Sequence, residues 1–377
     1  MFHPVADNGI SQAQVERMVT LANLAPSGDN CQPWRFRWDG AVLTVLRDGR
    51  RAGFELDHDG ELSRLALGCV LEALSLAAAG EGLGLSIEAT AHDTRDGATW
   101  ATVRLSPGAR AEPQPQDLEL LRALPERTTD RRHYRGGSES HPVFTRLQEE
   151  AARVPGCVLR VRPPSDPELL DYLCDVDGYV WSHEVLYRDV MRWIRFSHRE
   201  VQATRDGVPW CSMGIDFPEG MVPRFSRSRL AHRLISGLGL HAMSRAWVRR
   251  QLGSSAALVC LAAPPGGADT VTVGRLGMRV WLRLTQADWG VHPFTLPASF
   301  ARAAVRGSLP PVTRPEYAAL FTKGRDVLSR AFGLSNGELP VWLFRTGEST
   351  PLPAHTRTLR LPTERLLTVS GRVAEGS

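Results

Sequence analysis

The sequence predicts an α+β protein built from two halves, each with a mainly antiparallel sheet flanked by helices. The chain has 377 residues, more than one domain usually holds, so two domains are the starting expectation. Residues 62–82 carry apolar side chains at helical spacing, and residues 271–289 repeat that pattern. At a shift of 208 residues, Leu74 corresponds to Leu282 and Gly82 to Gly290. This weak repeat predicts two tandem, degenerate units.

The first predicted elements are a helix and a β-hairpin on either side of residues 25–34. Ser11 and Gln14 have the spacing of a capping box, which predicts a helix that begins there and ends before Pro26. Residues 34–38 alternate like a strand and turn at Asp39-Gly40 into a second strand, 41–46. Residues 25–34 are therefore expected to form a loop that is held at both ends.

This loop is rich in turn-forming and hydrogen-bonding residues: Pro26, Ser27, Asn30, Gln32 and Trp34. Its hydroxyl and amide groups can donate to and accept from the edge of a planar polar ligand. The alternative is an ordinary capped turn with Trp34 in the core. The pattern P-S-x-x-N-x-Q-P-W after a short helix resembles the signature of the nitroreductase-like flavoproteins. In that family this loop reaches the isoalloxazine ring of FMN, so the resemblance implies ring contacts for Pro26, Ser27, Asn30 and Gln32.

The first half continues with a polar loop, the helix at 62–82 and two strands, 85–89 and 101–105. Gly80-Glu81-Gly82 is interpreted as the C-cap of the helix, because a dinucleotide-binding turn needs a strand before it and a helix after it. Residues 106–115 have the composition of a linker and define the expected domain boundary.

The second informative stretch, residues 127–135, contains four arginines and two threonines. Arginine side chains match the paired oxygens of a phosphate, and threonine hydroxyls add hydrogen bonds. The alternative is a solvated basic turn. Here too the sequence resembles the nitroreductase-like family, in which an R-x-[ST]-x-R element binds the phosphate and ribityl chain of FMN. The resemblance places Arg127, Thr129 and Arg131 in this role, with Arg132 as a weaker candidate.

The remainder of the second half is predicted as a strand at 157–161, one or two helices over 167–196, an irregular segment from 205 to about 254, and a buried strand at 255–263. After the helix at 271–289 comes His292-Pro293-Phe294, which resembles the family's loop against the flavin. The final predicted strand, 338–347, contains Arg345, where relatives place a basic residue near the phosphate. The residues after 348 have the composition of a Pro-rich tail.

Composition narrows the possible partners and the location. The net charge is only +4, and the arginine-rich stretches 188–205 and 224–250 are interpreted as solvated faces, so no nucleic-acid partner is expected. Six cysteines show neither a C-x-x-C pair nor the spacing of metal ligands, which favours reduced thiols, no metal and a cytoplasmic protein. The amino terminus lacks a signal-peptide pattern and no long uncharged apolar segment is evident, so neither export nor a membrane partner is expected.

The two halves carry complementary parts of one FMN site: the Pro-Ser-Asn loop lies in residues 1–116, and the Arg-Thr element in 117–348, followed by the tail 349–377. This arrangement resembles the Acg-type subgroup, in which a fused single chain mimics the usual dimer and an extra segment forms a lid, here 181–244. The expected protein is thus a monomer that mimics a dimer, with further self-association possible.

The resemblance implies an FMN-dependent oxidoreductase. Hydride would pass from NAD(P)H through flavin N5 to an electron-poor acceptor, such as a nitroaromatic, a quinone or a related conjugated compound, in ping-pong turnover. The flavin carries this chemistry, so no side chain is assigned as a catalytic acid or base. Two alternatives remain open, an FMN-sequestering protein with a closed lid and a flavin oxidase or dehydrogenase acting on a specialised metabolite. No hydrolase motif is present.

Overall fold

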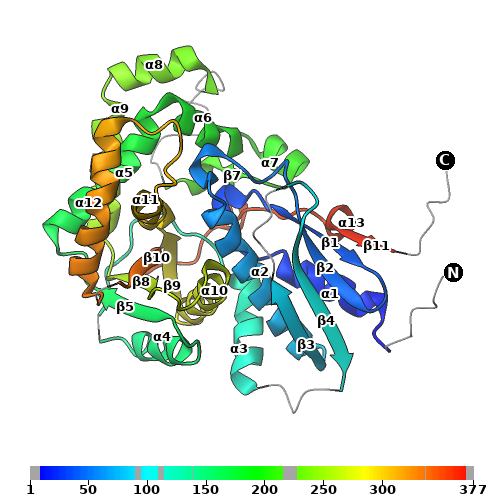
Figure 1. The fold of residues 1–377 in the computed structure, drawn as a ribbon. Coiled ribbons are helices and arrows are strands. Elements are labelled where there is room, and N and C mark those ends of the chain that lie inside the picture. The colour runs from blue at the N-terminus through cyan, green and yellow to red at the C-terminus, as the bar shows by residue number, and fades with distance from the viewer. Residues whose placement is uncertain are drawn as a thin grey trace.

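The computed structural model describes residues 9–89, 95–108, 114–138, 140–214, 227–335 and 337–370. Two sheets lie on opposite sides of a pair of long central helices, and further helices cover the outside (Figure 1). This arrangement confirms the α+β class.

The first sheet has five strands in the order β11-β1-β2-β4-β3. The elements of the first half are α1 (Gln12–Ala22), β1 (Trp34–Trp38), β2 (Val42–Arg47), α2 (Glu61–Gly80), β3 (Leu83–Ala89) and β4 (Thr99–Pro107). The capping box of Ser11 and Gln14 is present, and β1 and β2 pair as the predicted antiparallel hairpin. Helix α2 ends at Gly80, as the C-cap interpretation of that stretch requires.

The second sheet has four antiparallel strands in the order β5-β8-β10-β9. Its strands are β5 (Val158–Arg162), β8 (Ala257–Ala263), β9 (Trp289–Pro293) and β10 (Leu339–Glu348). The larger helices around it are α3 (Pro115–Ala123), α4 (Val143–Ala152), α5 (Pro167–Ser182), α6 (Glu184–Trp193), α7 (His198–Thr204), α8 (Arg229–Gly237), α9 (Leu240–Gly253), α10 (Thr270–Gln286), α11 (Thr295–Arg306) and α12 (Pro315–Phe332). Two short strands, β6 (Ile194–Arg195) and β7 (Val208–Pro209), form a separate ribbon.

The two sheets share one topology. In each, the four strands taken in chain order are arranged first, second, fourth, third, and every neighbouring pair among these four is antiparallel. In each half a long helix, α2 or α10, connects the second strand to the third. Helix α2 ends at Gly80 and α10 at Gln286, an offset of 206 residues rather than the 208 of the sequence pattern.

Three segments differ from the sequence expectations. Helix α10 ends at Gln286, so Trp289 begins a strand instead of ending a helix. The stretch expected to be irregular contains two helices, α8 and α9. The segment after residue 348 is more than a tail: its helix α13 (Thr363–Leu366) leads into β11 (Leu367–Val369), which pairs parallel with β1. The carboxyl-terminal segment therefore completes the sheet of the first half.

Helices α2 and α10 cross at the centre of the molecule and share one apolar core with both sheets (Figure 1). Charged groups also connect them: Arg279 of α10 contacts Glu72 at 2.8 Å, Asp117 of α3 at 3.1 Å and Glu150 of α4 at 2.6 Å. Helix α2 is the one described helix long and apolar enough to cross a membrane, but 83% of that apolar window is buried inside the protein. Its composition is explained by its central position.

Candidate functional site

A cavity of about 270 Å³ lies where the two halves meet. Its wall comes from the 26–33 loop, the start of α2, residues 129–131, helices α5, α6 and α9, and the end of β9. Of the predicted site residues it brings together Pro26, Ser27, Thr129, Arg131, His292, Pro293 and Phe294. Residues from both halves, more than 260 positions apart in the sequence, therefore face one space.

A second, smaller cavity of about 30 Å³ adjoins the first and shares four lining residues with it: Pro26, Ser27, Thr129 and Arg131. Four more of its lining residues are polar or charged: Asn30, Arg127, Thr358 and Arg360. This smaller cavity thus combines three arginines with the hydroxyls of serine and threonine.

Arg127 has unused hydrogen-bonding capacity. It is 7% exposed, and its guanidinium stacks on the Trp281 ring at 4.5 Å. Nη2 donates to the carbonyl of Leu24 at 3.0 Å, but Nε and Nη1 have no partner among the described residues. Burial lowers the pKa of Arg127 to about 10. A buried cation that lines a small cavity and has two unpaired donors favours an anionic ligand.

Arg360, in the carboxyl-terminal segment, was not predicted as a site residue. Its Nε donates to the carbonyl of Asn23 at 2.9 Å, and Nη1 donates to Asn30 Oδ1 at 2.6 Å and to Thr358 Oγ1 at 2.8 Å. All of these acceptors are uncharged. Burial, together with the nearby charge of Arg127, lowers the pKa of Arg360 to about 9. A bound anion would relieve the repulsion between these two guanidinium groups.

The loop at 27–32 has a constrained backbone. Asp29, Asn30 and Gln32 have positive φ angles of 46°, 56° and 51°, which is uncommon for residues other than glycine. Ser27 Oγ accepts a hydrogen bond from the backbone N–H of Gln32 at 2.9 Å and so closes the loop. Strained backbone that persists at a cavity wall is held by its surroundings and is typical of functional loops.

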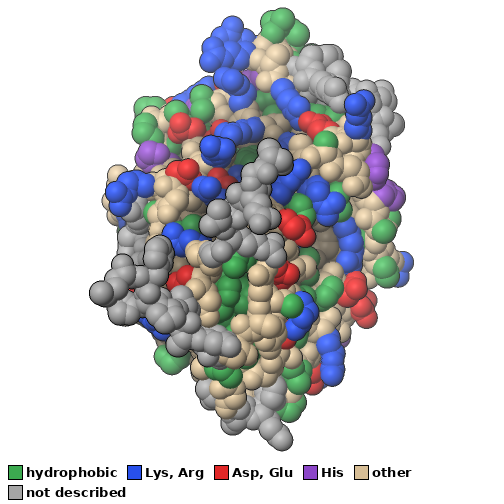
Figure 2. Space-filling view, turned by 90° about the vertical axis from the view of Figure 1, so that its right-hand side faces the viewer, with side chains coloured by type: hydrophobic (Ala, Val, Ile, Leu, Met, Phe, Trp, Pro, Cys, Tyr) green, Lys and Arg blue, Asp and Glu red, His purple; other side chains and the backbone are tan. Residues whose placement is uncertain are grey.

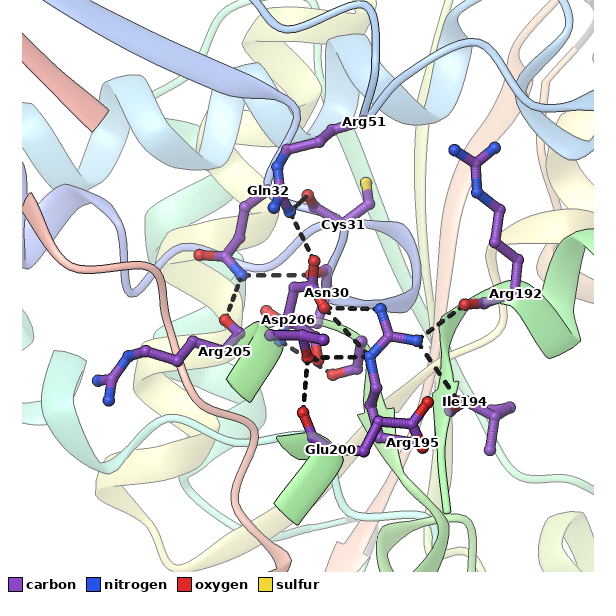
Figure 3. A network of polar contacts seen from close by, with 12 residues as sticks. Asn30, Cys31, Gln32, Arg51, Arg192, Ile194, Arg195, Glu200, Arg205 and Asp206 are labelled. Carbon is purple, nitrogen blue, oxygen red and sulfur yellow. Dashed lines mark hydrogen bonds and ion pairs between the residues drawn. The ribbon is translucent and has the colours of Figure 1, made fainter. Parts of the chain in front are cut away.

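The side chains of Asn30 and Gln32, which the resemblance assigns to flavin-ring contacts, form hydrogen bonds within the chain that hold this loop in place. Asn30 Nδ2 donates to the carbonyls of Gly207 and Leu359 at 3.0 and 2.9 Å. Gln32 Nε2 donates to the carbonyl of Arg205 at 3.1 Å (Figure 3). Its Oε1 accepts from the backbone N–H of Leu361 at 2.8 Å. The amide groups of both residues are thus bonded within the chain, and Asn30 also lines the smaller cavity.

A charged network lies beside these amides. Arg51 Nη1 donates to the carbonyl of Cys31 at 3.0 Å and pairs with Asp206 at 2.9 Å, while Arg195 pairs with the other oxygen of Asp206 at 2.6 Å (Figure 3). Residues 194–207 are thereby fixed against the 29–32 loop.

Two residues predicted as phosphate ligands, Arg345 and Arg132, have their partners within the protein. Arg345 is fully buried, and it donates to His292 Nδ1 at 3.1 Å and to the carbonyls of Gln251 and Arg132 at 3.2 and 2.9 Å. Arg132 pairs with Asp130 at 2.8 Å. Neither belongs to the lining of the two cavities described above. Their charges support the wall of the larger cavity instead of facing a ligand.

His292 is held neutral. Burial and the nearby charges of Arg345 and Arg131 lower its pKa well below the ordinary value. Since its Nδ1 accepts from Arg345, the ring proton is on Nε2. Gln251, which was not predicted, also lines the larger cavity, and its Oε1 has no hydrogen-bond partner among the described residues. A neutral N–H donor and a free acceptor are therefore available to a polar ring.

The rest of the larger cavity is aromatic and acidic. Trp181, Trp193 and Trp247 form part of its wall, beside Asp177 and Asp189. Burial raises the pKa of Asp177 to about 6, and it also raises the pKa of Asp189. This side of the cavity suits a planar, apolar group rather than an anion.

No protein-family model matches the chain. Two curated relatives from Mycobacterium tuberculosis are similar to part of it. One, named “Putative NAD(P)H nitroreductase Rv3131”, is 32% identical over 120 residues, which is 32% of this chain and 34% of the relative. The other, named “Putative NAD(P)H nitroreductase acg”, is 30% identical over 82 residues, which is 22% of this chain and 25% of the relative. The chain thus matches about a third or less of each relative's length. These relatives confirm the resemblance to nitroreductases, including the Acg type.

Solved structures give a fainter likeness. A nitroreductase from Anabaena variabilis covers 93% of this chain and 90% of its own, with 11% identity and a TM-score of 0.45. The nitroreductase NfnB from Mycobacterium smegmatis, solved with NADPH, covers 66% of this chain and 96% of its own, with 14% identity and a TM-score of 0.35.

Proposed function

We propose that the chain is an FMN-dependent NAD(P)H oxidoreductase of nitroreductase type. The observation that carries the proposal is the cluster of Arg127, Arg131 and Arg360 around a small cavity that opens beside a larger, partly aromatic one. Arg127 has two unpaired donors, and its described hydrogen bond is to a neutral oxygen. A phosphate monoester joined to a flat ring system matches both cavities.

The residues divide into two groups. Arg127, Thr129, Arg131 and Arg360 would hold the phosphate. Pro26, Ser27, Gln251, His292, Pro293 and Phe294 would contact the ring end. When bound, the flavin would supply hydride transfer at N5, from NADPH or NADH to a nitroaromatic, quinone or related acceptor, in ping-pong turnover.

The chain's own contribution is to bind, orient and exclude water. The indoles of Trp181 and Trp193 shield one side of the larger cavity, and His292 Nε2 and Gln251 Oε1 offer one donor and one acceptor. Hydrogen bonds within the chain keep the last two groups in place, because His292 Nδ1 accepts from Arg345 and Gln251 Nε2 donates to the carbonyl of Arg131. No side chain is required as an acid or base in this proposal.

The shared strand order of the two sheets supports a fused pair of nitroreductase-like units with one site per chain. We retain the domains 1–116 and 117–348, although the segment after 348 returns to the first half through β11 and Arg360. Such a chain would act as a cytoplasmic monomer that mimics a dimer.

An FMN-sequestering protein is the second candidate, since Trp181, Trp193 and Met213 of the proposed 181–244 lid line the larger cavity. A lid that stays shut would bind FMN and prevent its reduction. The oxidase or dehydrogenase alternative uses the same cofactor site with a different reductant.

Anaerobic mixing separates these functions. The purified protein, loaded with FMN, is mixed with NADPH or NADH while the visible flavin absorbance is followed, and a nitroaromatic or a quinone is then added. The Trp181→Ala variant opens the wall of the larger cavity. A point substitution is preferable to shortening the proposed lid, because residues 205 and 207 accept hydrogen bonds from Gln32 and Asn30. Bleaching of the wild type followed by reoxidation supports the oxidoreductase. Bleaching of the variant alone supports sequestration, and bleaching of neither contradicts the NAD(P)H assignment.

A further inference from the structure

Helix α8 carries a ridge of exposed leucines. Leu230, Leu234 and Leu238 recur every four residues at the surface, with exposed fractions of 68%, 61% and 80%, and Met243 at the start of α9 is 54% exposed. These four are among six large apolar residues that are exposed in the described parts of the chain. Contiguous apolar surface of this kind marks an interaction site.

The opposite face of α8 anchors the helix to the protein. Ala231 and His232 are buried, the His232 ring lies against Tyr187 at 4.6 Å, and its Nε2 is 3.1 Å from the carbonyl oxygen of Trp181. Figure 1 shows α8 as the outermost helix at the top of the molecule. Folding therefore accounts for one face of α8, whereas the leucine face has no partner among the residues that the structure describes.

The segment that carries this ridge has only basic charges of its own, and carboxylates of neighbouring elements pair with several of them, as Glu200 does with Arg227 and Asp171 with Arg249. Residues 227–253 contain six arginines and no aspartate or glutamate. The side chains of Arg229 and Arg233 are 69% and 74% exposed, and both approach a single carboxylate, that of Glu184. Apolar and basic side chains lie together at the top of the molecule (Figure 2). A second copy placed on the same ridge would bring these arginines against each other, so self-association is disfavoured.

We infer that α8 docks on an anionic lipid bilayer. The leucines would enter the boundary between headgroups and acyl chains, and the flanking arginines would contact lipid phosphates, as in amphipathic helices that lie in a membrane interface. This is peripheral attachment, and it revises the expectation of no membrane partner. It also places the Trp181 wall of the larger cavity close to the lipid, because α8 packs against that residue.

The test is co-sedimentation of the purified full chain with vesicles. One set contains equal amounts of phosphatidylglycerol and phosphatidylcholine, and the other contains phosphatidylcholine alone. The variants are L230S/L234S/L238S, R229E/R233E and the control V305S, which removes an exposed apolar side chain from α11 instead. Thermal unfolding verifies that each variant is folded.

We expect the wild type and V305S to bind the anionic vesicles and to be released by salt. Both proteins should bind neutral vesicles at least about tenfold more weakly. L230S/L234S/L238S and R229E/R233E should bind the anionic vesicles at least about tenfold more weakly than the wild type does. Failure of the wild type to bind anionic vesicles overturns the proposal, as does equal binding by the leucine variant. If the wild type ignores vesicles but is a dimer that the leucine substitutions dissociate, a second copy is the occupant and the membrane proposal is wrong.

Discussion

Gly68 of α2 and Gly274 of α10 meet where the two central helices cross. A Cβ atom added to Gly68 would lie 2.1 Å from the carbonyl oxygen of Val271 and 2.8 Å from the Cα of Gly274. One added to Gly274 would lie 2.4 Å from the carbonyl oxygen of Leu65. The two residues are 206 positions apart, the same offset that separates the ends of the helices. This close approach between the halves thus involves positions that correspond in the repeat.

Gly68→Ala should destabilise the protein, because both clashes are with backbone atoms that no side-chain rotation can relieve. We expect a loss of about 1–3 kcal/mol in the free energy of unfolding, measured by urea denaturation. Gly253→Ala, at the end of α9 with no atom within 4 Å of an added Cβ, is the matched control. It should leave stability unchanged or raise it slightly. Equal effects of the two substitutions would show that the helices separate easily at their crossing.

The phosphate assignment predicts a difference between two flavins. Arg127→Ala should weaken FMN by about tenfold or more, since a lost charge-assisted hydrogen bond costs about 1.5–3 kcal/mol, whereas riboflavin lacks the phosphate and should lose much less. Fluorescence titration of both flavins provides the measurement. Arg132→Ala is the control, because Arg132 is paired with Asp130 and lines neither cavity. A similar loss for FMN and riboflavin would mean that Arg127 acts through folding.

The proposed fused site predicts about one FMN per chain. The complementary elements occur once each, the Pro-Ser-Asn loop in the first half and the Arg-Thr element in the second. Acid extraction followed by flavin and protein quantitation decides the ratio, with extracted riboflavin as the standard for recovery. Two flavins per chain, or none after reconstitution with excess FMN, would contradict a single composite site.

Gln32 should control the docking of the carboxyl-terminal segment. Its Oε1 accepts from the amide of Leu361, so Gln32→Ala leaves that buried N–H without its partner and should cost about 1–3 kcal/mol. Hydrogen exchange at Leu361 should accelerate in this variant and stay slow in the control Gln202→Ala, whose side chain is exposed. If exchange is unchanged while riboflavin binding falls, Gln32 is a ring contact and the structural role described above is wrong.

Local patterns were the part of the structure that the sequence predicted well. The capping box at Ser11, the hairpin at Asp39-Gly40 and the end of α2 at Gly80 depend on residues within a few positions of one another. The loop at 26–27 and the elements at 129–131 and 292–294 were also placed at a common cavity. Each of these stretches has its own short motif.

Several features that the sequence did not reveal depend on contacts between distant segments. An amide such as Asn30 can bond a ligand or its own chain, and the sequence does not reveal that Gly207 and Leu359 lie within reach. Arg345 ends in a buried site because β10 pairs with β9, which brings His292 beside it. Arg360 lies in a Pro-rich segment without periodicity, so nothing nearby in the sequence indicated that it returns to the first half.

The last prediction concerns Glu61 at the start of α2, which connects this helix to α11. Burial alone would raise the pKa of its carboxyl, but the charges of Arg302, Arg306 and Arg64 outweigh burial and lower the pKa from 4.5 to about 2. Because the pKa is lower in the folded protein, the ionised carboxylate stabilises the fold above about pH 4.5, and this contribution is lost as the pH falls toward 2.

Glu61→Gln should therefore be less stable than the wild type at neutral pH, and the difference should shrink steadily as the pH falls below about 4.5. Its upper limit is about 3 kcal/mol, from the size of the pKa shift. Urea denaturation of both proteins across this range measures the difference, and other titrating groups largely cancel because both proteins contain them. Glu88→Gln, at an exposed position on β3, should show no such trend. A difference between wild type and Glu61→Gln that stays constant with pH would show that the loss comes from altered packing and not from the carboxylate charge.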